Sequence, residues 1–243
     1  MKTQGASQYS AGIRIAYSDV GPDLHIRLGA LFCHLYQVTL NLRKMQGQDI
    51  QSTRRLGMGW FVRKMRLTLK EYPEYEARLR IVTRVVGVHG IRLYRDYDIL
   101  LRQKRIGHLI SAWVYMNLDR RKPQPVPNSL IGGSTPNETN SVADWKPPSD
   151  IRNPDTCDIS VRSGDFDSNG HVNNTTYIDY LETACQRCLA QPYRIRQYNI
   201  TFLQEIPLDT DAVEVALSKD GSAVSFRMCA GTTRFAAGEL TIR

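Results

Sequence analysis

Polar side chains are crowded into one short segment of the chain, residues 165–182, just before an amphipathic pattern. The segment reads DFDSNGHVNNTTYIDYLE, and in it Asp167, Asn169 and His171 alternate with small residues. Carboxylates and imidazoles are the usual general acids and bases of enzymes. The first turn of a helix adds unsatisfied backbone N–H groups and the positive end of the helix dipole. These residue types therefore favour acid–base chemistry at the amino end of a helix.

Turn and cap chemistry explains part of this segment without any catalysis. Asp and Asn are common in the turns that precede helices, and this suffices for Asn173 and Asn174. We expect one of these two to be the N-cap, with the N–H groups beside them forming an oxyanion site. Asp165 more often orders such a turn than takes part in a reaction. Capping accounts for one or two polar residues, and not for an Asp, an Asn and a His at alternate positions.

The elements that would position this segment occur twice in the chain. SDVGPDLH (residues 18–25) and GDFDSNGH (164–171) each precede a helical pattern, and in each an Asp lies six residues before the His. KEYP (70–73) in the first half resembles QEIP (204–207) in the second. The offsets are 146 and 134 residues, so the first copy needs an insertion of twelve, which we place in the polar stretch 46–58.

Each copy predicts the same elements in the same order. A strand (9–17 or 157–162) leads through a polar turn to a helix (27–45 or 174–190) with apolar residues at spacings of three and four. Four β-rich segments follow in each copy. One helix wrapped by an antiparallel sheet is an α+β arrangement, known as the hotdog fold. The sequence therefore predicts a tandem (double) hotdog.

A stretch of unusual composition separates the two copies. It contains seven of the eleven prolines, together with many Gly, Ser, Thr and Asn residues. Such a composition buries little apolar surface and is typical of a linker. We therefore predict an N-terminal repeat at 1–121, a linker at 122–154 and a C-terminal repeat at 155–243, with the catalytic residues in the C-terminal repeat.

Positive charge is concentrated in the first half of the chain. Residues 1–122 hold 22 Lys and Arg against 9 Asp and Glu, whereas the whole chain has a net charge of +8. A one-sided positive field attracts an anionic partner, such as an acidic protein or a phosphate-bearing ligand. The chain shows no helix-turn-helix, zinc-finger or RNP-type motif, so we expect no nucleic-acid partner.

Composition also bears on where the protein works. The five cysteines are an odd number without the spacing of a disulfide framework, which suits a reducing compartment. The first ten residues have no apolar core typical of a secretory signal, and no apolar run is long enough to cross a bilayer. We therefore expect a cytoplasmic protein.

Three segments together resemble one family of enzymes. DFDSNGHVNNTTYIDYLE (165–182) resembles the D-x-D-x-N-x-H-V-N-N…Y…E stretch of the acyl-ACP thioesterases, the plant-type enzymes and their bacterial relatives. WFVRKMRLTLKEYPEYEARLRI (60–81) and SAWVYMNLDRRKPQPVP (111–127) resemble the first hotdog repeat of that family and its exit into the linker. The resemblance implies hydrolysis of fatty acyl-ACP to free fatty acid and ACP in fatty acid biosynthesis. The implied partner is acyl carrier protein with a phosphopantetheine-linked acyl chain, and no cofactor or metal is implied.

The same resemblance implies the catalytic residues. The catalytic Asp, Asn and His of the family fall on Asp167, Asn169 and His171, and a fourth residue, a Glu, falls on Glu205. Either carboxylate could activate water, with Asn169 orienting it and His171 holding the thioester carbonyl; covalent attack by a carboxylate stays open. Plant members often carry Cys directly after the Glu, and here that position is Ile206, which favours the water mechanism.

Alternation predicts how Glu205 is presented by the strand that follows the second helix. One face of that strand would carry Asn199, Thr201, Leu203 and Glu205. The other face, with Ile200 and Phe202, is the one that we expect to be packed. Glu205 would then face the polar turn.

The first repeat lacks part of the constellation. Aligning the two histidines gives the pairs His25 with His171, Gly21 with Asp167, Asp23 with Asn169 and Glu71 with Glu205. One carboxylate is thus missing from the first repeat, which we interpret as housing for the acyl chain. Met58, Trp60 and Met65 could line the channel.

The basic first half also suggests where the carrier protein would bind. We expect contacts from a cluster made of Arg54, Arg55, Arg63, Lys64 and Arg66. Neighbouring residues of a strand point to opposite faces, so these five cannot all contact one partner.

Other functions stay open at this point. An acyl-CoA thioesterase would share the fold and the carboxylate. A hotdog dehydratase or hydratase, or an acyl-binding module without activity, is a more distant alternative. The sequence leaves open the acyl chain length and whether the protein is a monomer or a homodimer.

Overall fold

The computed structural model describes residues 8–127, 144–189 and 193–243. The chain forms two compact units, each of which is described by itself. Unit 1 comprises Met1–Arg27 and Leu31–Trp145, and unit 2 comprises Leu28–Ala30 and Lys146–Arg243. The central part of the predicted linker, residues 128–143, lies outside the described residues.

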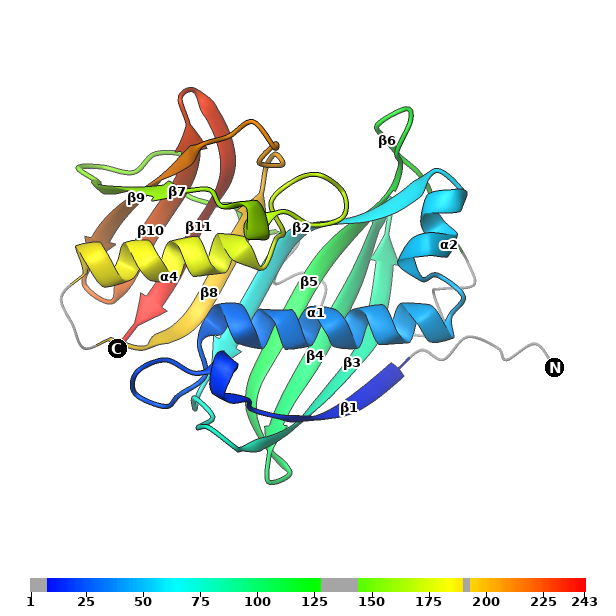
Figure 1. The fold of residues 1–243 in the computed structure, drawn as a ribbon, viewed down its shortest axis with the longest axis horizontal. Coiled ribbons are helices and arrows are strands. Elements are labelled where there is room, and N and C mark those ends of the chain that lie inside the picture. The colour runs from blue at the N-terminus through cyan, green and yellow to red at the C-terminus, as the bar shows by residue number, and fades with distance from the viewer. Residues whose placement is uncertain (1–7, 128–143, 190–192) are drawn as a thin grey trace. The chain divides into compact units, whose positions relative to one another are not determined.

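Unit 1 contains one long helix and an antiparallel sheet. Its helices are α1 (Leu28–Met45), apart from the first three residues, and α2 (Ile50–Arg55). Its strands are β1 (Gln8–Arg14), β2 (Met58–Leu69), β3 (Arg78–His89), β4 (Arg92–Leu101), β5 (Lys104–Asn117) and β6 (Lys122–Pro123). The strand order is β1-β3-β4-β5-β2, with β6 paired to β5. Figure 1 shows α1 running across one face of this sheet. The helix buries Leu31, Leu35, Val38 and Leu42, whose spacing of four and three places them on one side.

Unit 2 repeats this plan with one helix, α4 (Thr176–Cys188). Its strands are β7 (Asp155–Ser160), β8 (Ile195–Phe202), β9 (Ala212–Asp220), β10 (Ala223–Ala230) and β11 (Thr233–Ile242), in the order β8-β11-β10-β9-β7. The helix buries Tyr177, Leu181 and Ala184, as predicted from their spacings of four and three. The β9–β10 turn contains Gly221 at φ 60°, a left-handed backbone that glycine adopts without steric cost. Both units thus have the helix and antiparallel sheet that the sequence predicts.

The internal repeat is confirmed by matching backbone hydrogen bonds. Gly21 N–H donates to His25 O over 2.9 Å, and Asp167 N–H donates to His171 O over the same distance. A second pair of bonds matches with the same offset of 146: Arg27 N to Asp19 O and Asn173 N to Asp165 O. The two polar turns therefore share one backbone conformation, including the place of each histidine.

The second half of the predicted alignment is wrong by one residue. Ile26 N–H donates to Pro73 O, and Val172 N–H donates to Ile206 O. Pro73 is therefore the counterpart of Ile206, so Tyr72, and not Glu71, corresponds to Glu205. The sequence alignment was misled by the prolines of KEYP and QEIP. Helix α2 lies within the polar stretch 46–58, where the insertion was predicted.

Candidate active site

Asp165 anchors the polar turn of unit 2. Its Oδ2 accepts hydrogen bonds from Arg162 N (2.8 Å) and from the hydroxyl of Tyr180 on α4 (2.7 Å), and Arg162 Nη2 donates to Oδ1 over 2.9 Å. Burial alone would raise the pKa of Asp165, but these hydrogen bonds outweigh it and hold the pKa below its usual range. Asp165 therefore orders the turn, as expected from the sequence.

This anchor predicts an acid-dependent contribution to stability. A carboxylate with a lowered pKa stabilises the fold above its unfolded pKa, about 3.9 for Asp, and the contribution is lost as the pH falls through the folded pKa. Asp165→Asn should therefore lower the free energy of unfolding by about 1–3 kcal/mol at pH 7. In urea titrations from pH 7 to pH 3, the gap between wild type and variant should narrow below about pH 4. A gap that stays constant over this range would contradict the assignment.

His171 stands between the two carboxylates that the sequence singled out. Its Nδ1 lies 3.8 Å from Asp167 Oδ1, and its Nε2 lies 3.5 Å from Glu205 Oε1. The imidazole is 12% exposed, and its Nε2 is buried without a hydrogen-bond partner among the described residues. Nδ1 also lies 3.3 Å from the main-chain O of Val172, an acceptor that favours a proton on Nδ1. Nε2 is then the nitrogen that is left to exchange a proton with substrate, water or Glu205.

Asp167 and Asn169 are joined by two hydrogen bonds. Asn169 N–H donates to Asp167 Oδ1 over 2.7 Å, and Asn169 Nδ2 donates to Oδ2 over 3.1 Å. The next residue of this turn, Gly170, has a left-handed φ of 80°. The matching position of unit 1 is Leu24, at φ 58°. Both oxygens of Asp167 are thus engaged by Asn169, whereas Glu205 has a side chain that is 44% exposed.

The predicted helix cap is wrong by one or two residues. Helix α4 begins at Thr176, and its N-cap residue is Thr175. Asn173 instead accepts at Oδ1 from both the N–H and the hydroxyl of Thr175, at 3.0 Å each, and its main-chain O accepts from Thr176 N. Residues 173–175 therefore form an extra turn before the helix. Among the hydrogen bonds of the described residues, none uses the main-chain N–H of Asn174.

Glu205 is not presented by regular alternation, contrary to the sequence prediction. Strand β8 ends at Phe202, and the N–H groups of Leu203 and Gln204 both donate to Phe235 O, at 2.7 and 3.2 Å. Two successive residues sharing one acceptor break the period of two. The face predicted to be less packed is also buried, with Asn199 3% and Thr201 6% exposed.

Tyr177 fixes the backbone on both sides of Glu205. Its hydroxyl donates to Gln204 O over 3.3 Å and accepts from Ile206 N–H over 3.1 Å. Burial raises the pKa of Tyr177, and the nearby carboxylates of Glu205 and Asp167 raise it further. The sequence predicted Tyr177 only as part of the apolar helix face. Its counterpart in unit 1, at the offset of 146, is Leu31, and this contrast between the repeats is the signal that sequence reasoning could have used.

Removing this hydroxyl tests whether it positions Glu205. If Glu205 is catalytic, as the family resemblance implies, Tyr177→Phe should lower kcat about tenfold and leave KM within about twofold, because misplacing a reacting group mainly slows chemistry. Two lost hydrogen bonds should also lower Tm by a few degrees. Tyr180→Phe is the matched control, since its hydroxyl binds Asp165 and not the Glu205 segment. A loss of Tm without a change in kcat would assign Tyr177 a purely structural role.

The matching turn of unit 1 also places a histidine between two carboxylates. His25 Nδ1 lies 2.8 Å from Asp23 O and 3.9 Å from Asp23 Oδ1, and its Nε2 lies 3.8 Å from Glu74 Oε1. Gly21 occupies the place of Asp167, so the first of these carboxylates comes from Asp23, at the place of Asn169. Unit 1 therefore lacks the amide that Asn169 provides in unit 2, and the side chain of His25 is more exposed than that of His171, 30% against 12%.

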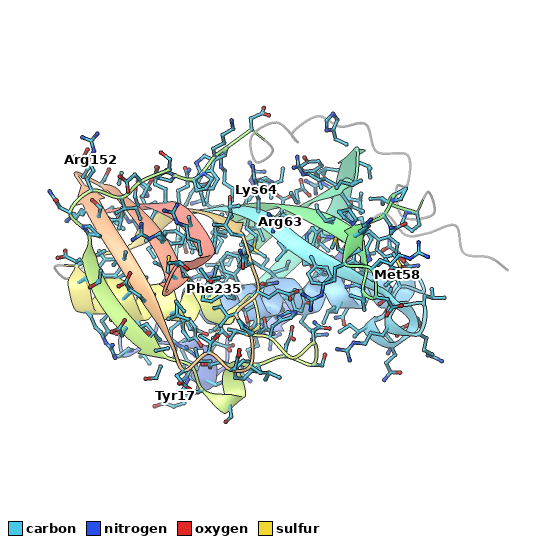
Figure 2. The ribbon with its side chains drawn as sticks, turned by 90° about the horizontal axis from the view of Figure 1, so that it is seen from above. Tyr17, Met58, Arg63, Lys64, Arg152 and Phe235 are labelled. Carbon is cyan, nitrogen blue, oxygen red and sulfur yellow. The ribbon has the colours of Figure 1, made fainter. Side chains whose placement is uncertain are left out.

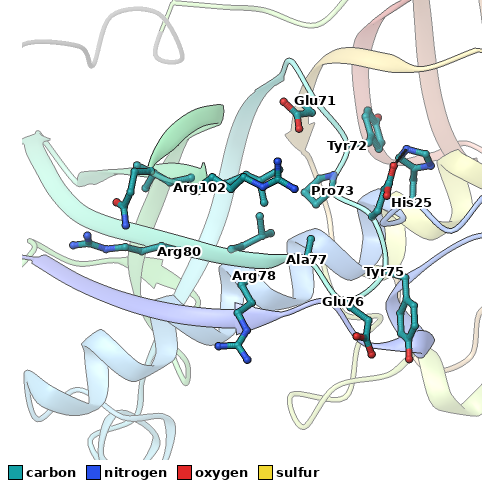
Figure 3. Close-up of a pocket in the computed structure, with 15 residues that line it drawn as sticks. His25, Glu71, Tyr72, Pro73, Tyr75, Glu76, Ala77, Arg78, Arg80 and Arg102 are labelled. Atoms are coloured by element: carbon teal, nitrogen blue, oxygen red, sulfur yellow. Dashed lines mark ion pairs between the residues drawn. The ribbon is translucent and has the colours of Figure 1, made fainter.

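An open groove of about 860 Å³ adjoins this histidine within unit 1. Figure 3 shows His25 at one end and Arg78, Arg80 and Arg102 farther along. The groove also contains Glu71, Glu74 and Glu76, and Glu76 is paired with Arg14. Its lining is therefore of mixed charge.

The residues of the predicted carrier-binding cluster lie on two elements of unit 1. Arg54 and Arg55 are exposed at the end of α2, and Arg63, Lys64 and Arg66 lie on β2. Figure 2 shows Arg63 and Lys64 next to each other, where the register of β2 shifts. Burial and the neighbouring Arg92 lower the pKa of Arg63. Lys64 Nζ donates to Trp145 O over 2.7 Å, so part of its donor capacity is used within the protein.

The cysteines are all free thiols. Burial raises the pKa of Cys185 to about 12, so this thiol is not a nucleophile near neutral pH. No three His, Cys, Asp or Glu side chains in the described part of the chain are grouped so that they could hold a metal ion. None of the described helices is both long and apolar enough to span a membrane.

Two family models match most of the chain. One is described as the acyl-ACP thioesterase N-terminal domain and matches residues 6–133; the other, the acyl-ACP thioesterase C-terminal domain, matches residues 149–233. Among curated relatives, a chloroplastic dodecanoyl-[acyl-carrier-protein] hydrolase of Cinnamomum camphora is 24% identical over 93% of this chain and 63% of its own length. A chloroplastic palmitoyl-acyl carrier protein thioesterase of Arabidopsis thaliana is 26% identical, over 79% of this chain and 50% of its own. The chain thus spans less than two thirds of the length of these relatives.

Solved structures show the same fold. An acyl-ACP thioesterase of Bacteroides thetaiotaomicron superposes with a TM-score of 0.81 at 19% identity, over 99% of this chain and all of the other. A 12:0-ACP thioesterase of Umbellularia californica gives a TM-score of 0.83 at 17% identity, over 98% of each chain. The predicted tandem hotdog is thereby confirmed.

Proposed function

We propose that this chain, which belongs to the acyl-ACP thioesterase family, hydrolyses the thioester of fatty acyl-ACP to a free fatty acid and ACP in fatty acid biosynthesis. The observation that carries the proposal is the convergence of Asp167 and Glu205 on His171 beside the amino end of α4. A base, a proton carrier and helix-end N–H groups are the parts that hydrolysis of a thioester requires.

The contacts favour Glu205 over Asp167 as the general base. Asp167 accepts two hydrogen bonds from Asn169, so its oxygens orient the turn and the amide. Glu205 is half-exposed, and neither of its oxygens accepts a hydrogen bond among the described residues; its ion-pair partner is His171, and it also lies near Tyr177. We therefore assign the activation of water to Glu205, its orientation to Asn169, and the placement of His171 to Asp167.

The reaction then proceeds in two steps at the amino end of α4. Glu205 takes a proton from water and passes it to His171 Nε2, while the hydroxide adds to the thioester carbon; the resulting imidazolium and the main-chain N–H of Asn174 stabilise the oxyanion. The tetrahedral intermediate collapses, the C–S bond breaks, and the imidazolium gives its proton to the phosphopantetheine sulfur, which leaves as a thiol. Asn173 contributes by holding the extra turn that presents Asn174.

The proposed reaction is tested with acyl-ACP substrates of graded chain length. Release of free thiol and fatty acid by the wild-type protein is expected, with no water addition to an enoyl thioester. An acyl-CoA thioesterase is the second candidate, and matched ACP and CoA esters separate the two. Equal kcat/KM values on both would contradict a carrier-specific function, and hydration of the enoyl thioester would overturn hydrolysis.

The exposed arginines of α2 provide a test of the carrier protein as partner. Arg54→Glu with Arg55→Glu should raise KM for acyl-ACP about five- to tenfold and leave kcat unchanged, because rim charges act mainly on encounter. The effect should shrink above about 0.3 M salt as charges are screened. KM for the matching acyl-CoA should change less. An unchanged KM for acyl-ACP would show that the carrier protein does not bind at the end of α2.

A cytoplasmic location is proposed together with this function. It is supported by the five free thiols, which persist in a reducing compartment. We propose a monomer or a homodimer as the functional form, because a tandem of two repeats can provide within one chain the pairing of two hotdog units.

A further inference from the structure

The open groove of unit 1 has an arginine end that the proposed reaction does not use. The volume of the groove is about 860 Å³, within the range of small-molecule sites in proteins. Figure 3 shows Arg78, Arg80 and Arg102 along it, away from the end that holds His25. All three arginines are exposed. A groove of this size with several cations along one part is a candidate site for an anion.

The sheet places these arginines on one face. Arg78 and Arg80 are two residues apart on β3, so their side chains leave the same side of the strand, and Leu79 between them is buried on the other side. Leu101 of β4 pairs with Leu79, so Arg102, the next residue, lies level with Arg78. The Cα atom of Arg78 is then about 5–7 Å from those of Arg80 and Arg102, a separation that arginine side chains can span.

The acids of the groove offset only part of this charge. Glu76 pairs with Arg14, and Glu74 lies 3.8 Å from His25 Nε2, which leaves Glu71 as the remaining acid of the lining. None of the three groove arginines forms an ion pair or a side-chain hydrogen bond with the described residues. The arginine end therefore carries a net positive charge.

Like charges also face one another across the strands. Arg14 of β1 is directly opposite Arg78 in the register of β1 and β3. Arginine opposite arginine destabilises a sheet. Glu76 pairs with Arg14, whereas no acid pairs with Arg78 among the described residues. Such a local conflict is expected where side chains serve a ligand rather than the fold.

Arg102 lies in a turn that favours other residues. It forms the two-residue β4–β5 turn with Gln103, and their φ values of 49° and 64° are left-handed. Asn-Gly and Asp-Gly dominate such turns, because they adopt this backbone at low cost. Gly90, Gly221 and Gly231 take the left-handed position in three other two-residue turns. The backbone of the turn does not explain an arginine at position 102, whereas an anion in the groove does.

We propose that this part of the groove binds a diphosphate group, held by Arg78, Arg80 and Arg102. Guanidinium groups bind phosphate oxygens through paired hydrogen bonds, and a diphosphate has enough oxygens for three of them. The side chains are spread along the groove, and the rotamer changes that are common on binding bring them onto one ligand. The bound anion also offsets the repulsion between Arg78 and Arg14. The inference does not depend on the proposed thioesterase activity.

Thermal unfolding with sodium pyrophosphate tests the site, with sodium chloride at equal ionic strength as the reference. A ligand that binds only the folded state should raise Tm in a saturable way, by about 5 °C at a hundredfold excess over Kd. Pyrophosphate should produce this rise and chloride should not. No rise, or an equal rise in both salts, would overturn the proposal.

Substitutions on the strands locate the effect at the arginine end. Arg80→Gln should weaken pyrophosphate binding about tenfold to hundredfold, because it removes a charged hydrogen-bond donor. Arg92→Gln is its control, since Arg92 is an exposed arginine at the opposite end of β4. A full response in Arg80→Gln, or an equal loss in Arg92→Gln, would show that pyrophosphate binds elsewhere.

The β4–β5 turn supplies a second pair of variants. Arg102→Asn should raise Tm without ligand by about 1–3 °C, because asparagine suits the left-handed position, and should weaken pyrophosphate binding about tenfold. Gln103→Asn should bring a similar gain in Tm and keep the full response, because Arg102 stays in place. A variant that is more stable and yet binds less separates a ligand site from a structural role. Equal binding by the two variants would contradict the role of Arg102.

Nucleotides decide where the diphosphate comes from. ADP and AMP are titrated beside pyrophosphate in the wild-type protein and in Arg80→Gln. If the ligand is a nucleotide, ADP should act at a lower concentration than pyrophosphate; if it is free diphosphate, the two should act alike. In both cases AMP, which has one phosphate, should bind more weakly than ADP. Equal binding of AMP and ADP would overturn the recognition of a diphosphate, and an Arg80-independent response to all three would exclude the site.

Discussion

Glu205→Gln should lower kcat for acyl-ACP hydrolysis by about 10²–10⁴-fold, the usual contribution of a general base. KM should stay within about twofold, because the variant removes a group that acts in the transition state and leaves substrate binding in place. Glutamine has nearly the same shape as glutamate but cannot accept a proton from water near neutral pH. The measurement is steady-state thiol release from acyl-ACP, with Tm recorded for each protein.

The fold itself offers the control for this variant. Glu74 lies 3.8 Å from His25 in unit 1, much as Glu205 lies 3.5 Å from His171 in unit 2. Glu74→Gln should leave kcat within about twofold, because unit 1 carries Asp23 at the place of Asn169 and so lacks the amide assigned to orient water. If Glu74→Gln were as damaging as Glu205→Gln, the catalytic assignment to unit 2 would be wrong. A normal kcat in Glu205→Gln would mean that Asp167, and not Glu205, is the general base.

Periodicity and turn chemistry were enough to predict the elements of both units. Apolar residues at spacings of three and four placed Tyr177, Leu181 and Ala184 on the buried face of α4, where they lie. The repeat was visible because Asp19 and Asp165 both precede a histidine by six residues, and the same hydrogen bonds close both turns. Local interactions decide such features, so they can be predicted from local sequence.

The presentation of Glu205 depends on contacts that are distant in sequence. The end of β8 is set by Phe235 O, which accepts from both Leu203 and Gln204 across the sheet. The position of the following residues is set by the hydroxyl of Tyr177, from a helix that is 27 residues away from its acceptor, Gln204 O. An alternation rule has no access to either contact. The carboxylate was identified from the family resemblance, and its geometry came only from the structure.

The two repeats also show how a shared turn can be specialised. Position 21 has lost the side chain that Asp167 provides, and Leu31 lacks the hydroxyl by which Tyr177 holds the Glu205 segment. Both differences remove polar contacts from unit 1 without changing the backbone hydrogen bonds of the turn. Conversely, unit 1 buries Arg43 and Arg95, and this polarity was not predicted, because the sequence suggested an apolar channel around Trp60.

His171→Ala should lower kcat/KM for acyl-ACP by about 10²–10³-fold, since it removes the group that passes the proton and helps to hold the oxyanion. The imidazole is only 12% exposed, so a modest fall in Tm is expected as well. His25→Ala controls for that loss of packing, because His25 occupies the same turn position in unit 1. It should lower Tm by a smaller amount, because the side chain of His25 is 30% exposed, and leave kcat/KM within about twofold.

Asp167→Asn completes the test of the proposed roles, because Asp167 is assigned to placing His171, whose Nδ1 lies 3.8 Å from its carboxylate. The single variant should lose about 10-fold to 10²-fold in kcat, and the double variant with His171→Ala should be no slower than His171→Ala alone. Residues that act as one unit show such non-additive losses, whereas independent contributions multiply. The four proteins of this cycle are compared by kcat at saturating acyl-ACP. Losses that multiply would show that Asp167 contributes to hydrolysis by a route that does not pass through His171, such as orienting water with Asn169.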